Sequence, residues 1–425
     1  MPVSNLSPIT VRASNSSQTV ADYSCSGTND QNTVRSAINQ ILASGSQTGK
    51  IFLYSGDYNF DGLLGVPAGI TIEGANMYTT KIYSKGNHDC IISEGFSTGS
   101  IPYNSQLYVE LRNFTIIAGT GSTFANYAIR GAFSESRFEF LHIDHMGKGI
   151  SLNEIHDFPG FISPGGYLNK IMNCNIVALE DSLIMSYRNL DSWILTNNMG
   201  AGRYNINLNG GPYRILNNHL NGTGSDQPII NIFSDLGINS AIIQSNICEN
   251  AKYESIKILR VSNPSIDNSN ICFANNNIRY ASQASSGTYN MVTLIGNGQT
   301  LKGITFVGNL FEQRGNAVNN VIALNNCSEI TISGNDLGVE ALTNQVVEMV
   351  STDKVQIFSN SHVGLNDYKQ LTKPFDVDGD YIRINDSRAP VASDPGETGQ
   401  ICWDKNYIFV CVSSGDWKRA EIFSY

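Results

Sequence analysis

The stretch Ile194-Leu195-Thr196-Asn197 returns as Ile215-Leu216-Asn217-Asn218 and again as Ile243-Gln244-Ser245-Asn246. In each copy an apolar residue is followed, three positions later, by asparagine. Four further copies keep this pattern and end at Asn276, Asn309, Asn335 and Asn360. The asparagines are separated by 21, 28, 30, 33, 26 and 25 residues. A repeat of this length indicates a solenoid.

The repeating unit is typical of one coil of a parallel β-helix. It is too short for two helices, and glycine and asparagine separate its short apolar runs. Successive coils would stack about 4.8 Å apart. Asparagine suits the turn because it tolerates a left-handed backbone and because its amide can bond to the asparagine above and below. We therefore predict a ladder of stacked asparagine side chains, which satisfies polar groups that would otherwise be buried unpaired.

The same apolar position continues upstream without the asparagine. It is occupied by Leu111, Phe138 and Ile171. The residues three positions later are Phe114, Leu141 and Cys174. We therefore expect the coils to extend toward the N-terminus while the ladder becomes apolar. An all-β sandwich would also contain many strands, but it would not repeat one turn residue in one register.

A helix is predicted before the first coils. Its apolar face has the spacing i, i+4, i+7, i+8 and consists of Val34, Ile38, Ile41 and Leu42. The helix should begin at a cap near Asn29 or Asp30. It would cover the open first coil, whose strand edges would otherwise favour aggregation. A strand over residues 50–54 follows, then Gly56-Asp57-Tyr58 and the stretch VPAGITIEGA at residues 66–75.

This order of helix, strand and VPAGITIEGA resembles the start of the pectate-lyase-superfamily β-helices of bacteriophage tailspikes. The resemblance covers residues 20–85 by motif and 105–385 by repeat. Asp22-Tyr23-Ser24-Cys25 and Gly27-Thr28-Asn29-Asp30 depart from the Asp-Phe-Gly-Ala and Gly-Asp-Gly-x-x-Asp-Asp forms usual in that family. The resemblance implies an all-β fold, a single-stranded right-handed parallel β-helix with an N-terminal capping helix. It says much less about the chemistry.

Composition limits the possible partners. The chain has a formal charge of −10, with 27 basic and 37 acidic residues and no basic run, so we expect no nucleic-acid partner. Neither an apolar secretion signal nor a membrane helix is evident, and we expect no membrane partner. Only 15% of the residues are charged, which suits a polar surface that meets sugars.

The 8 cysteines are scattered and show no metal-binding spacing, so we predict no metal site and no cofactor, although calcium held by turn carboxylates stays open. Cys174, Cys248 and Cys272 should be small buried apolar residues. Cys402 and Cys411 could face each other across a hairpin, and we expect free thiols for both.

The chain divides into five segments. They are an N-terminal arm (1–20), the helix-capped beginning (21–100), the β-helix body (101–385), a linker (386–399) and a small C-terminal β module (400–425). In this C-terminal module, apolar strands flank Asp404-Lys405-Asn406 on both sides, which predicts a hairpin. The module resembles the short one that ends many phage tail proteins, which implies a homotrimer in which sister chains bury Trp403 and Trp417. The alternative is a cap folded onto the last coil of its own chain.

The candidate catalytic groups fall at similar offsets from the repeat. This column consists of Lys148, Glu180, Asp181, Arg203, Tyr204 and Asp226. Groups on adjacent coils would be about 5 Å apart and those two coils apart about 10 Å. Inverting glycosidases place their carboxyl groups about 6.5–9.5 Å apart. We therefore predict Glu180 or Asp181, together with Asp226, as acid and base.

Further residues are predicted to bind substrate. Arg203 and Tyr204 would orient a sugar, and Lys148, Trp193 and Asp235 are near in sequence. The longest insertion, residues 151–170, would contribute His156 and Tyr167 from a loop on a rigid coil. The alternative is that the acids are solvated turn residues, since aspartate favours turns.

A second cluster would suit a lyase. It contains His142, Asp144, His145, Glu154, His156 and Asp157. β-Elimination requires a base for the proton α to a uronic carboxyl group and a cation to neutralise that carboxyl group. His145 or His156 could act as the base, with Lys148 or Arg188 as the cation. His219, beside a ladder asparagine, is expected to be structural.

The resemblance implies a tailspike-like protein that binds and depolymerises a bacterial surface polysaccharide, either capsule or O-antigen, by glycoside hydrolysis. The alternatives are a polysaccharide lyase, a non-catalytic receptor-binding spike and a host-derived pectinase-like enzyme. The last is disfavoured because no export signal is evident and the C-terminal module resembles a viral one. The protein would be made in the bacterial cytoplasm and located in the virion, where the N-terminal arm could contact other phage tail proteins.

Overall fold

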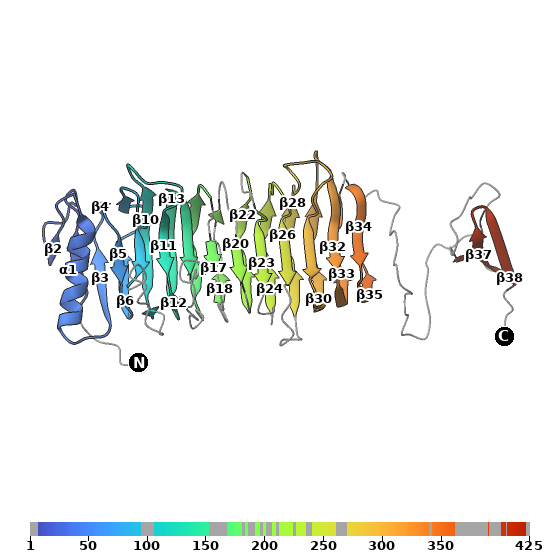
Figure 1. Ribbon diagram of the computed structural model, residues 1–425, viewed down its shortest axis with the longest axis horizontal. Helices are drawn as coiled ribbons and strands as arrows, with labels where there is room; N and C mark the ends of the chain where they lie inside the picture. Colours follow the sequence, from blue (N-terminus) through green and yellow to red (C-terminus); the bar gives the residue numbers. More distant parts are fainter. Residues whose placement is uncertain are drawn as a thin grey trace. The chain divides into compact units, whose positions relative to one another are not determined.

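The computed structural model describes residues 7–94, 106–152, 168–180, 183–185, 192–195, 199–200, 206–209, 212–223, 227–234, 240–260, 270–339, 342–361, 390, 401–404 and 406–421. The chain forms two compact units, residues 1–373 and 374–425. The first unit is the predicted right-handed parallel β-helix, whose coils follow one another from α1 and β2 to β34 and β35 (Figure 1).

Each coil contributes strands to three parallel stacks, which we number in chain order. Stack 1 contains β2 (Tyr23–Ser24), β1 (Ile9–Arg12), β3 (Gly49–Leu53), β6 (Ile70–Gly74), the first halves of β10 (Glu110–Ala118) and β13 (Arg137–Met146), β15 (Lys170–Met172), β18 (Ser192–Leu195), β21 (Tyr213–Leu216), β24 (Ala241–Gln244), β27 (Ile271–Ala274), β30 (Leu301–Val307), β33 (Cys327–Ser333) and β35 (Asp353–Phe358).

Stack 2 follows the turn that carries the ladder. It contains β4 (Gly56–Phe60), β7 (Thr80–Ser84), the second halves of β10 and β13, β16 (Asn175–Ala178), β19 (Met199–Gly200), β22 (His219–Asn221), β25 (Ile247–Glu249), β28 (Asn277–Arg279) and β31 (Leu310–Glu312).

Stack 3 closes each coil. It contains β5 (Leu64–Val66), β8 (Ile91–Ser93), β11 (Tyr127–Gly131), β14 (Lys148–Leu152), β17 (Leu183–Met185), β20 (Ile206–Asn209), β23 (Ile230–Ser234), β26 (Ile256–Arg260), β29 (Val292–Gly296), β32 (Val318–Asn325) and β34 (Leu342–Val350). A short parallel pair, β9 (Gln106–Leu107) and β12 (Phe133–Ser134), lies outside the three stacks.

Alternation of side chains along the strands builds the core. In β6 the residues Ile70, Ile72 and Gly74 are buried while Thr71 and Glu73 are half-buried. The inward positions then stack coil on coil, and in stack 3 Ile129 lies between Ile91 and Ile150. Each such side chain stabilises the fold by roughly 1.5–3 kcal/mol relative to an exposed one.

The asparagine ladder is confirmed over six of its seven positions. The Nδ2 atoms donate to the Oδ1 atom of the next asparagine along the series Asn218, Asn246, Asn276, Asn309, Asn335 and Asn360, at 2.8, 3.0, 2.9, 2.8 and 2.9 Å. Asn197 lies outside the described residues. The upstream continuation is confirmed too, because Phe114, Leu141 and Cys174 are buried.

One reason given for asparagine in the turn is wrong. The ladder residues do not adopt the left-handed conformation, which is instead found one position earlier. The residues concerned have φ angles of 54–64°, and they are Asn217, Ser245, Asn275, Gly308, Gly334 and Ser359. The ladder position therefore requires asparagine for its amide group alone.

Helix α1 (Asp30–Ala43) begins after Asn29, as predicted, and Val34, Ile38 and Ile41 are buried. Leu42 is 38% exposed, so its predicted place on the buried face is wrong, and Ala37 occupies that face instead. The buried Asp30 carboxylate accepts hydrogen bonds from the amides of Gly27 and Asn59 at 2.9 and 2.8 Å. The bond from Asn59 attaches the helix to β4, and the bond from Gly27 fixes the turn before the helix. Among the described residues, no helix could span a membrane.

Some of the predicted N-terminal arm belongs to the β-helix. Residues 9–12 form β1, which pairs with β3 and with β2. The period of the asparagine repeat did not show this strand, because β1 precedes the helix and carries no turn residue of the repeat.

The second unit contains an antiparallel sheet of β36 (Ile401–Trp403), β37 (Tyr407–Ser413) and β38 (Asp416–Glu421). This confirms the predicted hairpin and adds a third strand.

The two cysteines of this sheet do not face each other, because Cys402 pairs with Phe409 and Cys411 pairs with Trp417. All 8 cysteines are free. Cys174 and Cys248 are buried as predicted, whereas Cys272 is only half-buried. The predicted linker lies outside the described residues except for Pro390.

Candidate functional site

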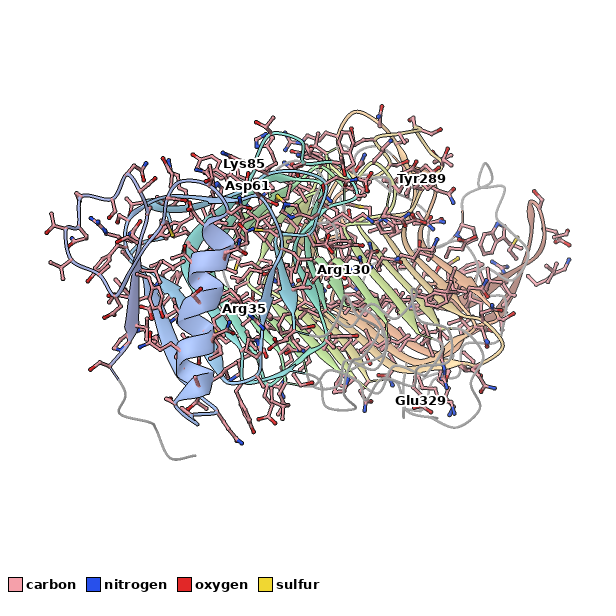
Figure 2. The ribbon with its side chains drawn as sticks, turned by 60° about the vertical axis from the view of Figure 1, so that its left-hand side comes forward. Arg35, Asp61, Lys85, Arg130, Tyr289 and Glu329 are labelled. Atoms are coloured by element: carbon pink, nitrogen blue, oxygen red, sulfur yellow. The ribbon has the colours of Figure 1, made fainter. Side chains whose placement is uncertain are left out.

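The turns that connect stack 2 to stack 3 bring two of the predicted site residues to neighbouring coils. Lys148 begins β14, and its amide donates to the carbonyl oxygen of Asn126 at 2.9 Å. Glu180 follows β16, and its amide donates to the carbonyl oxygen of Gly147 at 2.8 Å. Tyr127, Lys148 and Glu180 therefore lie on three consecutive coils. Figure 2 shows Lys85 and Tyr289, which belong to such turns on other coils, along the same edge of the β-helix.

Two charged side chains on this edge contact Tyr127. It is buried at the start of β11 and pairs in register with Lys148. The Nζ atom of Lys148 lies 3.2 Å from the Tyr127 hydroxyl oxygen and 5.0 Å from the ring centroid. The guanidinium carbon of Arg130 lies 4.7 Å from the same centroid. Two cations therefore contact one aromatic ring.

Asp89 balances one of these cations. Its carboxylate lies 3.6 Å from Nη1 of Arg130 and accepts a hydrogen bond from the Tyr127 amide at 2.9 Å. Lys148 has no carboxylate partner among the described residues, and its ammonium group is half-buried. The local excess of charge at Tyr127 is therefore positive and lies on Lys148.

The turn that packs against the start of β14 carries an exposed aromatic residue. Phe124 is 59% exposed and belongs to the turn 119–126. The carbonyl oxygen of Phe124 lies so close to Gly147 that a Cβ atom there would be 2.4 Å away. Asn126 fixes the turn, because its Nδ2 atom donates to Oδ1 of Asn87 at 3.1 Å and its Oδ1 atom accepts from the Thr123 amide at 2.7 Å. The turn that carries Phe124 is thus held against the backbone just before Lys148.

Glu180 supplies the carboxylate of this edge. It is half-buried, and within the described residues its carboxylate makes no ion pair or hydrogen bond. A carboxyl group without a fixed partner can accept a proton when ionised or donate one when protonated, which general acid–base chemistry requires. The geometry thus combines an acid or base, a cation, and an apolar ring.

Most of the other predicted site residues lie outside the described residues: Asp181, Asp226, Arg203, Tyr204, Tyr167, His156 and Asp235. Trp193 lies on β18 in stack 1, paired with Lys170 and Arg214. The structure therefore does not bring Trp193 to the turn that carries Lys148 and Glu180. The regular repeat placed Trp193 near the column in sequence, but stack 1 and this turn are different regions of a coil.

The histidine cluster proposed for a lyase lies partly on stack 2. His142, Asp144 and His145 belong to the second half of β13, where His145 contacts the Asp144 carboxylate. Glu154, His156 and Asp157 lie outside the described residues.

His219 bonds to the Glu249 carboxylate at 2.9 Å, in line with its expected structural role. Among the described residues, no group of three or more His, Cys, Asp and Glu side chains could hold a metal ion.

Buried cysteines near the site are poor nucleophiles. Burial raises the pKa of the Cys90 thiol to about 12. Burial raises the pKa of Cys174, in the coil of Glu180, to about 12 as well. Because the thiolate is the reactive form, both residues are inert apolar groups of the core.

Sequence reasoning missed four residues of this edge, namely Asp89, Phe124, Tyr127 and Arg130. The turn before β11 is longer than the turns from which the offsets were counted, so Tyr127 falls 16 positions after Leu111 whereas Lys148 falls 10 after Phe138. A search for a charged residue inside an apolar strand would have found Arg130, the one charged residue of β11.

No protein-family model matches the chain. No curated protein matches its sequence. Solved structures are nevertheless similar. The DFA-IIIase from Arthrobacter chlorophenolicus A6, in complex with GF2, is 12% identical with a TM-score of 0.59, over 82% of this chain and 94% of that chain. The A-module of the mannuronan C-5 epimerase AlgE6 from Azotobacter vinelandii is 11% identical with a TM-score of 0.52, over 80% of this chain and 97% of that chain.

The Dettilon tailspike protein is also similar, at 14% identity with a TM-score of 0.44, over 75% of this chain and 64% of that chain. At these identities the similarity concerns the fold. The chain is a parallel β-helix, the fold that it shares with the DFA-IIIase and the epimerase A-module.

Proposed function

We propose that this protein binds a bacterial surface polysaccharide, capsule or O-antigen, and depolymerises it by glycoside hydrolysis, as a tailspike-like protein. The observation that carries the proposal is the edge at Tyr127, where exposed Phe124, the cation of Lys148 and the unpartnered carboxylate of Glu180 occupy neighbouring coils. The names of two structures with the same fold, a mannuronan epimerase and a DFA-IIIase bound to GF2, support carbohydrate as the substrate class.

A second aromatic surface farther along the edge suits a long chain. The rings of Tyr253 and Tyr289 pack edge to face, with their centroids 4.9 Å apart. Both residues are half-exposed, and both belong to turns between stack 2 and stack 3. Sugar rings pack their apolar faces on aromatic rings, so aromatic residues on several coils favour a polysaccharide and internal cleavage over a monosaccharide.

In the proposed reaction, Glu180 or Asp181 and Asp226 share the acid and base roles. The protonated carboxyl group donates its proton to the glycosidic oxygen, and the bond from this oxygen to the anomeric carbon breaks. The carboxylate takes a proton from water, whose oxygen bonds to the anomeric carbon. Two shorter chains result. Lys148, His156, Tyr167, Arg203, Tyr204 and Asp235 are proposed to bind sugar.

Lys148 also favours a second candidate, a lyase, because β-elimination needs a cation at the uronic carboxyl group. His145, the described candidate for the base, contacts the Asp144 carboxylate, whereas the Glu180 carboxylate has no such partner among the described residues. Hydrolysis is therefore the first choice. A receptor-binding spike without catalysis would use the same edge for binding alone.

The oligomeric state is proposed to be a homotrimer formed through the second unit. Ile401, Ile408 and Val412 are 58%, 42% and 44% exposed. The register places them on one face of the small sheet with Val410, since Ile401 pairs with Val410 and the strand alternates. Apolar surface of this kind favours contact with another chain. Sedimentation of the full chain and of an Ile408→Asp variant tests this contact, and an unchanged mass would contradict it.

The experiment that tests the function uses purified capsule and O-antigen from a panel of bacterial strains. Chain length is measured by size-exclusion chromatography, together with ultraviolet absorbance of unsaturated uronates. Shortening without new absorbance supports hydrolysis, and shortening with absorbance supports the lyase. Binding without shortening on every strain would leave a receptor-binding spike. Labelling of virions with an antibody against the chain tests the proposed location in the phage tail and the attachment of the N-terminal arm.

A further inference from the structure

We infer that the polysaccharide is acidic, and that a carboxylate on one of its sugar rings binds the ammonium group of Lys148 beside Tyr127 and Phe124. The inference rests on the proposed function, because it names the substrate class of the same site. It is carried by three features of the described residues, which are the partner of Lys148, the charges around Tyr127, and the exposed ring of Phe124.

The first feature is the partner of the Lys148 ammonium group. Four other lysines of the described chain have a carboxylate nearby: Lys50, Lys257, Lys354 and Lys418 lie 2.7, 3.9, 3.2 and 3.0 Å from Glu73, Glu254, Glu329 and Asp416. Lys148 instead donates to the neutral hydroxyl group of Tyr127. An ammonium group has three donors, so two remain for a ligand. A half-buried cation is unfavourable until an anion pairs with it.

The second feature is the charge around Tyr127. Arg130, labelled in Figure 2, brings a guanidinium group 4.7 Å from the same ring, and Asp89 neutralises that group at 3.6 Å. The positive charge of Lys148 is left without a carboxylate among the described residues. It also lies one coil from the carboxylate of Glu180. An acidic sugar near Glu180 would be repelled by that carboxylate, and Lys148 offsets the repulsion.

The third feature is the neighbouring aromatic ring. A sugar acid presents an apolar C–H face and a carboxylate on the same ring. Phe124 offers an exposed apolar surface, and its carbonyl oxygen closely approaches Gly147, the residue before Lys148. A neutral sugar would use Phe124 but would leave the ammonium group of Lys148 unpaired. The combination therefore selects an acidic ring.

Affinity electrophoresis of the full chain tests the inference. The gels contain polygalacturonate, hyaluronan or polysialic acid as carboxylate polymers, glycerol teichoic acid as a phosphate polymer, and dextran as a neutral polymer. We expect retardation by at least one carboxylate polymer. Reduction of the carboxyl groups of that polymer to alcohols should abolish the retardation, and added salt should weaken it, because screening reduces the attraction between exposed charges.

Variants assign the effect to Lys148. Lys148→Met should weaken binding by about 10- to 100-fold, the loss expected for one charge-assisted hydrogen bond. Lys148→Arg keeps the charge and should retain more affinity. Lys354→Met removes an exposed lysine that pairs with Glu329 on stack 1, and it should leave binding unchanged. If Lys148→Met fails to fold, Lys148→Arg and the reduced polymer still provide the comparison.

Several results would overturn the inference: no retardation by any carboxylate polymer, retardation by teichoic acid alone, unchanged binding of the carboxyl-reduced polymer, or wild-type affinity of Lys148→Met. Measuring the chain length of the same polymers after incubation distinguishes failure of this inference from failure of the proposed hydrolysis. Binding of a carboxylate polymer without shortening supports the acidic ligand and contradicts hydrolysis. Shortening of a neutral surface polysaccharide supports hydrolysis and contradicts the acidic ligand.

Discussion

The amide nitrogen of Glu180 donates a hydrogen bond of 2.8 Å to the carbonyl oxygen of Gly147, which places Glu180 on the coil next to Lys148. The Glu180 carboxylate thus belongs to the edge that contains Tyr127 and Phe124. If Glu180 is the general acid or base, Glu180→Gln should lower kcat by about 100-fold or more, because acid–base catalysis contributes that much. Binding should be retained, since the amide has nearly the same shape. Release of reducing ends measures the rate.

Glu329→Gln is a suitable control for this substitution. Glu329, labelled in Figure 2, is exposed on β33 in stack 1. It pairs with Lys354, and its loss should leave the rate unchanged. Full activity of Glu180→Gln together with an inactive Asp181→Asn variant would transfer the role to Asp181. Full activity of both variants would remove the acid–base assignment from this pair.

The ladder should contribute strongly to stability. Asn276 is buried, and its Nδ2 atom donates to Oδ1 of Asn309 at 2.9 Å and to the Ile243 carbonyl oxygen at 2.8 Å. Its Oδ1 atom accepts from the amide of Asn246 at 3.0 Å. Asn276→Ala leaves these groups buried and unpaired, so we expect a loss of about 2–4 kcal/mol in the free energy of unfolding. Urea denaturation measures it.

Asn297→Ala provides the comparison for the ladder, because Asn297 is exposed. This variant should change the free energy of unfolding by less than about 0.5 kcal/mol, as is usual for surface positions. Equal effects of the two substitutions would contradict the importance of the buried amide contacts. A smaller loss of unfolding free energy for Asn276→Ala than for Asn297→Ala would contradict it as well.

The sequence allowed the fold to be predicted because a β-helix repeats its register. Once Asn218 and Asn246 are recognised as equivalent, Ile215 and Ile243 must pair, and the structure has this pairing. The start of the chain was less predictable. Residues 9–12 form β1 without any ladder residue, and only long-range pairing with β3 shows that they belong to the coils.

The site was harder to predict than the fold, because it lies in the turns, whose lengths vary. Counting offsets placed Lys148 and Glu180 on one edge correctly, since their coils have similar turns. The same count missed Tyr127, which follows a longer turn. It also grouped Trp193 with the edge, although β18 lies in stack 1. Spacing along the chain equals position in space only where the turns are of equal length.

Stability should depend on pH through Glu73. Burial alone would raise the pKa of this carboxyl group, but hydrogen bonds and charges from Lys50 and Arg112 outweigh burial and lower the pKa. Both cations lie 2.7 Å from Oε2 of Glu73. A folded pKa below the unfolded one gives stability that is present above the unfolded pKa, about 4.3. This stability is lost as the pH falls through the folded pKa.

Glu73→Gln tests the contribution of this ion pair. At pH 7 the variant should be less stable than the wild type by about 1–2 kcal/mol, the amount expected for a charge-assisted hydrogen bond. The difference should shrink as the pH falls below about 4, because the wild-type carboxyl group becomes protonated there. Thermal unfolding of both proteins between pH 7 and pH 3 measures it. A difference that stays constant over this range would contradict the electrostatic origin.

Gly147 should control the position of Lys148. A Cβ atom at Gly147 would lie 2.4 Å from the Phe124 carbonyl oxygen, too close for any real contact, so the backbone before β14 must shift. A displacement of about 1 Å can lower catalysis by about 100-fold. We expect Gly147→Ala to lose activity and affinity for the polysaccharide while keeping most of its secondary structure by circular dichroism. Gly65→Ala is the matched control. Gly65 lies in β5 of stack 3, and a Cβ atom there would meet Nη1 of Arg35 at an ordinary 3.6 Å. Wild-type activity of Gly147→Ala would show that the edge tolerates the displacement and that Phe124 and Lys148 need not be adjacent.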